Sequence, residues 1–124
     1  MRLLELAGTL AALAPPGVVP AALRTMAAAY APGAPLPRAM ARAWLGSQGD
    51  KNALLALAWA RERVRLTLEE ILARVPARGA LPGSPETRSR LILAACEAMA
   101  LEPPSAVSDR LRALLELNGY AAEV

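Results

Sequence analysis

The sequence contains no histidine and only one cysteine, Cys96, in 124 residues. A single cysteine cannot form an intramolecular disulfide, and without an imidazole the chain cannot build a Ser-His-Asp arrangement or a thiol–imidazole pair. The same shortage removes the usual ligands of a zinc site. We therefore predict no metal, no cofactor and no catalytic residue, and a protein that is not an enzyme. Because Cys96 lies in a strongly apolar segment, we interpret it as a buried structural cysteine.

Aromatic residues and residues that favour strands are also scarce. Phenylalanine is absent and aromatic residues make up 3% of the chain, although 55% of it is hydrophobic. Alanine and leucine supply most of the apolar mass, and both favour helix. The length is that of one domain. These features predict a single all-α domain over residues 1–124, folded as a bundle of about six helices.

The formal net charge is +3, from 14 basic and 11 acidic residues. This balance permits an anionic partner but does not require one. The first 14 residues begin with a positive charge and are apolar, faintly like a signal peptide. Glu5 interrupts them, however, and Pro15-Pro16-Gly17 ends the segment before it reaches membrane-spanning length. We therefore expect a cytoplasmic protein with no membrane partner.

Proline and glycine divide the chain into six segments with helical periodicity. Ser84 is expected to cap the fifth segment, with Pro85 at its first helical position. On the fourth and longest segment, Arg65 and Glu69 are expected to share a solvated face. The predicted helices span residues 2–14, 20–31, 36–46, 51–75, 85–101 and 105–118.

The fifth helix contains LILAACEAMAL, residues 91–101, where Glu97 is the only charge. A helix that is apolar on nearly every side must be covered on nearly every side. The sixth helix carries an apolar seam with coiled-coil spacing. We predict a two-fold homodimer in which the last two helices of each subunit form a four-helix interface. A central place for the fifth helix in a monomeric bundle is the alternative. The predicted interface residues are Leu91, Ala94, Ala95, Ala98, Leu111, Leu114, Leu115 and Asn118.

The order of elements over residues 50–119 is distinctive. A long helix ends in ILARVPARGAL, a short Pro/Gly turn follows, and then come SPETRSRLILAACEAMAL and a Leu-rich last helix. This order resembles the C-terminal half of TetR-type transcriptional regulators. The resemblance implies dimerisation through the last two helices and a small hydrophobic effector bound within the bundle. Such regulators begin with a helix-turn-helix module, for which this sequence has no room. It is either a piece of a longer regulator or a domain without DNA contact, and we expect no specific DNA binding by this chain alone.

Five large residues are the candidates for lining an effector cavity. Bulky and flexible side chains with a few polar groups suit ligand pockets, but a chain without phenylalanine also needs its large residues to fill the core. The leading hypothesis is a ligand-responsive dimeric regulatory domain. The alternative is a helical module that binds another protein through its apolar C-terminal helices. The candidate ligand-binding residues are Met26, Tyr30, Met40, Trp44 and Trp59, with Gln48 and Asn52 as polar contacts.

Overall fold

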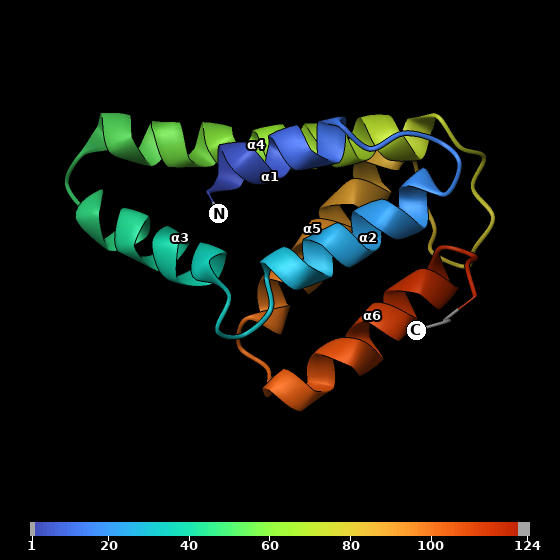
Figure 1. The fold of residues 1–124 in the computed structure, drawn as a ribbon. Coiled ribbons are helices and arrows are strands. Elements are labelled where there is room, and N and C mark those ends of the chain that lie inside the picture. Colours follow the sequence, from blue (N-terminus) through green and yellow to red (C-terminus); the bar gives the residue numbers. More distant parts are fainter. Residues whose placement is uncertain (1, 122–124) are drawn as a thin grey trace.

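The computed structural model describes residues 2–121 and confirms the all-α fold (Figure 1). No strand occurs in this part of the chain. The sixth predicted segment begins with a short 3-10 turn, Pro104–Ala106, before its α-helix starts. The helices are α1 (Leu3–Ala11), α2 (Val18–Ala29), α3 (Pro35–Gly46), α4 (Lys51–Ala73), α5 (Pro85–Met99) and α6 (Val107–Leu117).

The predicted cap of α5 is present. The Thr87 amide donates to Ser84 Oγ at 3.3 Å, and Pro85 occupies the first helical position. At the start of α4, the Ala53 amide donates to Asp50 Oδ1 at 3.1 Å. Both caps satisfy amide groups that have no partner inside their own helix. The start of α5 was therefore predictable from Ser84 and Pro85.

The helix at the centre of the bundle is α2. It contacts α1, α3, α4, α5 and α6, and Ala22, Leu23 and Met26 on it are fully buried. Alanines at buried positions let neighbouring helices approach closely, which explains how a 12-residue helix fits among so many partners. The helix that is covered on nearly every side is thus α2. α5 packs mainly on α4 and leaves one of its own faces exposed.

α4 is longer than the core that it crosses. Its 23 residues extend about 35 Å, but its buried residues all lie between Val64 and Leu72. The first half of α4 projects beyond α2 and α5, and α3 lies alongside this projection (Figure 1). α3 itself contributes one buried residue, Leu36. We call residues 35–63 the α3–α4 arm, because this part is packed more loosely than the rest.

Arg65 is placed differently from the prediction, which put it on a solvated face. Its side chain is buried, and its guanidinium donates to three partners on α4 and α5. Nε and Nη2 donate to the Glu62 carboxylate at 2.7 and 3.0 Å, and Nη1 donates to Glu69 at 2.8 Å and to Ser89 Oγ at 3.1 Å. A guanidinium leaves water only when its donors are paired in this way. The predicted pairing of Arg65 with Glu69 is confirmed, but the cluster joins two helices.

Replacing Arg65 by Met should cost about 1–3 kcal/mol of unfolding free energy, because charged hydrogen bonds are lost while both carboxylates can turn to water. Removing the partners should cost more. The double variant Glu62→Ala/Glu69→Ala leaves the guanidinium buried and unpaired, with an expected cost of about 3–5 kcal/mol. Urea unfolding measures the loss of unfolding free energy in Arg65→Met and in the double variant. The exposed Glu70→Ala is the matched control. A double variant as stable as Arg65→Met would contradict this description of the cluster.

The connection between α4 and α5 packs directly on the end of α6. The Leu81 amide donates to the Leu117 carbonyl at 3.0 Å. A Cβ on Gly79 would overlap the backbone of residues 117–119, and a Cβ on Gly119 would overlap the backbone of Arg78. Gly119 also has a φ of 85°, which disfavours any side chain. Only glycine fits where the backbone of the α4–α5 connection touches the backbone at the end of α6.

Gly79→Ala should therefore lower the unfolding free energy by more than about 1 kcal/mol, since backbone atoms must move to make room. Gly8 is the matched control, because it lies in the middle of α1 and a Cβ there meets nothing within 4 Å. Gly8→Ala should raise stability by about 1 kcal/mol through helix propensity. Thermal unfolding of the two variants should give melting temperatures that shift in opposite directions. Two shifts of the same sign would contradict the close approach.

Candidate functional site

A groove of about 450 Å³ lies between α1, α3 and α4. Its walls come from the first turn of α1, one face of α3 and the first half of α4. Eight of its ten lining residues are apolar, and none is acidic. We call it the α1–α3–α4 groove. Its lining residues are Arg2, Leu3, Leu4, Leu36, Ala39, Met40, Arg42, Ala43, Leu57 and Ala60.

Alanine side chains form part of the groove walls on both α3 and α4. Leu36, Ala39, Met40 and Ala43 are spaced three and four residues apart, so they form one face of α3. Across from them, α4 presents Ala60 beside Leu57. Longer side chains at the alanine positions would fill the space between the helices. The alanine-rich composition thus leaves an apolar hollow where α3 packs on the projecting half of α4.

A second hollow, of about 400 Å³, continues on the other side of Met40 and Leu57, which line both spaces. Its further lining residues are Ala41, Trp44, Leu54, Ala58 and Arg61. The charge of Arg61 is already matched, because Nε and Nη2 each donate to the Glu97 carboxylate at 2.7 Å. These hydrogen bonds to Glu97 raise the pKa of Arg61. The second hollow is therefore apolar and lacks an unpaired charge.

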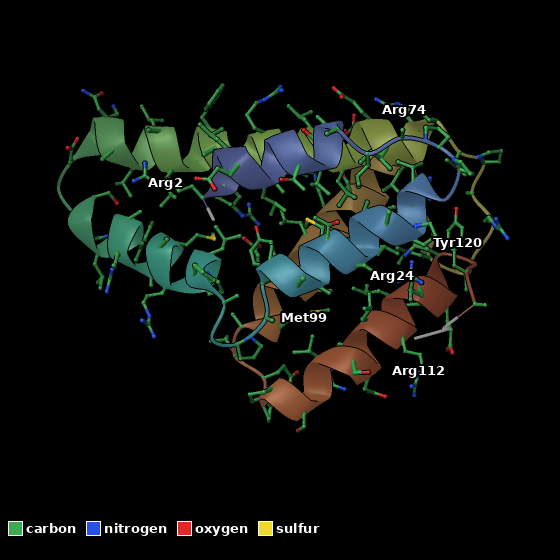
Figure 2. All side chains as sticks on the ribbon, in the orientation of Figure 1. Arg2, Arg24, Arg74, Met99, Arg112 and Tyr120 are labelled. Carbon is green, nitrogen blue, oxygen red and sulfur yellow. The ribbon has the colours of Figure 1, made fainter. Side chains whose placement is uncertain are left out.

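Two arginines, Arg2 and Arg42, give the α1–α3–α4 groove its charge. Arg2 immediately precedes α1 and Arg42 lies on α3. Figure 2 shows Arg2 in the space between α3 and α4. Within residues 2–121, no hydrogen bond or ion pair engages either side chain. The groove thus combines apolar walls with two cations whose charge is not matched by a neighbouring carboxylate.

The structure separates the five predicted ligand residues into three groups. Met40 lines both hollows, and Trp44 lines the second one. Met26 and Tyr30 are buried in the core around α2, with 0% and 1% of their surface exposed. Trp59 is 60% exposed on α4 and lines neither hollow. Of the five predicted residues, Met40 alone therefore lines the α1–α3–α4 groove.

The two predicted polar contacts, Gln48 and Asn52, are exposed and line neither hollow. Gln48 Nε2 donates instead to the Trp44 carbonyl at 3.1 Å, which closes the end of α3. Sequence reasoning missed Leu57, Ala60 and the two arginines of the groove. The helical periodicity did not single out these four residues, which lie on three different segments of the chain.

Tyr30 and Cys96 are buried ionisable groups whose surroundings favour the protonated form. Burial raises the pKa of the Cys96 thiol to about 12, and the neighbouring Glu97 adds to this effect. The pKa of Tyr30 is raised by the same two causes, and no partner for its hydroxyl is found among the described residues. A thiol that stays protonated is a poor nucleophile. Within residues 2–121, no group of three or more acidic or sulfur ligands is placed to hold a metal ion.

Some of the predicted dimer residues are exposed, and others are buried within the subunit. Leu91, Ala94 and Ala98 are exposed on α5, and Leu101, in the turn that follows this helix, is 90% exposed. We call these four residues the α5 stripe. Ala95 and Leu111 are half-buried.

The part of the predicted interface on α6 is largely covered from within the chain. Leu114, Leu115 and Asn118 are buried in the subunit, and α6 packs against α2. Asn118 Nδ2 donates to the Leu114 carbonyl at 2.8 Å inside α6. These three side chains are therefore not available at the surface, and the apolar seam of α6 serves the core of one subunit. The α5 stripe is the exposed part of the prediction.

Comparison with family models, with curated proteins and with solved structures finds no match for this chain. Among residues 2–121, no helix combines the length and the hydropathy needed to cross a bilayer.

Proposed function

We propose that this chain is a helical ligand-binding domain that takes up a small, mainly apolar molecule in the α1–α3–α4 groove. The supporting observation is the groove itself, a hollow of about 450 Å³ with apolar walls from three helices. Ligand sites in proteins usually have volumes of about 300–1,000 Å³ and are lined mainly by apolar groups. The proposal involves binding and no chemical step. It agrees with the effector binding that the TetR-type resemblance implies.

The loose packing of α3 suggests how binding would be transmitted. α3 is held in the core by Leu36 and contacts both α2 and α4. A molecule in the groove would touch α1, α3 and α4 together, and would favour the arrangement in which all three are close. Ligand binding then shifts the population of α3 positions, and α2 carries the shift to the other helices. A regulatory domain of the expected kind would use such a shift.

The groove can be blocked at an exposed position without disturbing the core. Ala43 lines the groove from α3, whereas Ala56 is exposed on α4 and lines neither hollow. With decanol as a neutral apolar probe, the wild-type chain should show an increase in melting temperature that grows with probe concentration. Ala43→Phe should lose most of this increase, because the ring occupies the groove.

Ala56→Phe is the matched control and should keep the wild-type response, since it adds the same ring outside the groove. Differential scanning calorimetry of the three proteins with and without decanol gives the comparison. If Ala43→Phe responds to decanol as strongly as Ala56→Phe does, the groove is not the binding site.

A second candidate function rests on the α5 stripe. Leu91, Ala94, Ala98 and Leu101 recur at alternating intervals of three and four residues, and the small alanines permit close approach of another helix. We propose that this face pairs with a second copy of the chain, as the resemblance implies. Binding of a different protein by the same face is the alternative.

Sedimentation at micromolar concentration should show a dimer of the wild-type chain. Ala98→Arg should give a folded monomer, because the charge is added to an exposed position where it disrupts only the intermolecular contact. Ala28→Arg, at an exposed alanine of α2, should remain dimeric. A monomeric wild-type chain would contradict self-association through α5.

A further inference from the structure

We propose that the ligand of the α1–α3–α4 groove is an amphipathic carboxylate, a molecule with an unbranched apolar chain and one carboxylate head. This inference rests on the proposed function and specifies the chemical class of its ligand. It depends on the two arginines of the groove, which the apolar-ligand proposal leaves without a role.

The head group is indicated by charge complementarity. Arg2 and Arg42 come from two different helical elements and line the same groove, whose other lining residues are all uncharged. Neither guanidinium has a carboxylate partner within the described residues. Elsewhere in the arm, Arg61 is fully paired with Glu97. An anion between Arg2 and Arg42 would supply the missing counter-charge through charge-assisted hydrogen bonds.

A carboxylate matches these donors better than a phosphate monoester does. Two guanidinium groups carry two positive charges and bind carboxylate and phosphate alike, so the choice between these heads rests on the other donors of the groove. A phosphate monoester carries up to two charges and three terminal oxygens, and phosphate sites add amide or hydroxyl donors. No hydroxyl-bearing or amide-bearing side chain lines this groove.

The apolar walls suit an unbranched chain. On α3, the lining runs from Leu36 to Ala43, a distance of about 10 Å along the helix axis. This is close to the length of a medium alkyl chain. The groove lies beside the second hollow at Met40 and Leu57, and that hollow has no unpaired charge. A longer chain would continue there, while the head stays near Arg2 and Arg42.

The test compares ligands that share a ten-carbon chain and differ in the head: decanoate, decanol, decyl phosphate and decyltrimethylammonium. Isothermal titration calorimetry, below the concentration at which any of them forms micelles, should give the tightest binding for decanoate. Raising the salt concentration should weaken binding of decanoate and leave that of decanol unchanged. Arg42→Gln and Arg2→Gln should each weaken decanoate binding about fivefold, as expected for an exposed ion pair, with decanol again unchanged.

Arg38→Gln is the matched control, because Arg38 is an exposed arginine of α3 that does not line the groove. It should bind decanoate as the wild type does. Equal affinities for decanoate and decanol, tighter binding of decyl phosphate, or an equal loss in Arg38→Gln and Arg42→Gln would each overturn the carboxylate assignment while leaving an apolar site. Absence of binding by all four ligands would instead overturn the proposed function.

Discussion

The structure depends on the difference in length between α4 and the core around α2. α4 has 23 residues and α2 has 12, so about half of α4 extends beyond the helix that fills the centre of the bundle. The second half of α4 is covered by α1, α2 and α5 and supplies all of its buried residues. The first half lies beside α3 and the start of α1 and meets α5 through the Arg61–Glu97 ion pair, and hollows remain on both sides of Met40. The groove is a consequence of this mismatch in length.

The two ends of the molecule are consequently held in different ways. At the core end, the buried Arg65 cluster joins α4 to α5, and the contact between Gly79 and Gly119 joins the following connection to α6. These contacts are directional or sterically exact, so they tolerate little movement. The α3–α4 arm is held mainly by apolar contacts, with Leu36 as the single buried residue of α3, and by the exposed Arg61–Glu97 ion pair to α5. Apolar contacts without fixed geometry permit small shifts, which is what uptake of a ligand requires.

The sequence was sufficient to predict the helices and was insufficient to predict their neighbours. Ser84 and the proline and glycine positions mark helix ends through local chemistry, so the boundaries were predicted to within a few residues, although α2 begins at Val18 and not at Pro20. Periodicity shows that a helix has an apolar face, but not which neighbour covers it. Alanine fits both buried and exposed positions. The fifth segment therefore resembled a fully buried helix, although Ala94 and Ala98 are exposed and α2 occupies the centre.

The candidate site was likewise only partly predictable from the sequence. Met40 and Trp44 were predicted because large, flexible side chains suit ligand pockets, and they do line the hollows. Met26 and Tyr30 meet the same criterion, but the chain without phenylalanine uses them to fill its core. Arg65 was expected in water because charged residues four apart usually share a solvated face. Its burial depends on Ser89 of α5, a partner 24 residues away that no local pattern identifies.

The central claim is that the α3–α4 arm is a loosely packed, ligand-accepting part attached to a rigid core. Amide hydrogen exchange followed by mass spectrometry, with and without decanol, tests it directly, because exchange reports local opening. Without the probe, amides of α3 and the first half of α4 should exchange much faster than those of α2 and the second half of α4. With decanol, exchange in the arm should slow while the core stays unchanged. Equal protection of arm and core without the probe, or slowing that is spread over all helices with it, would contradict the account.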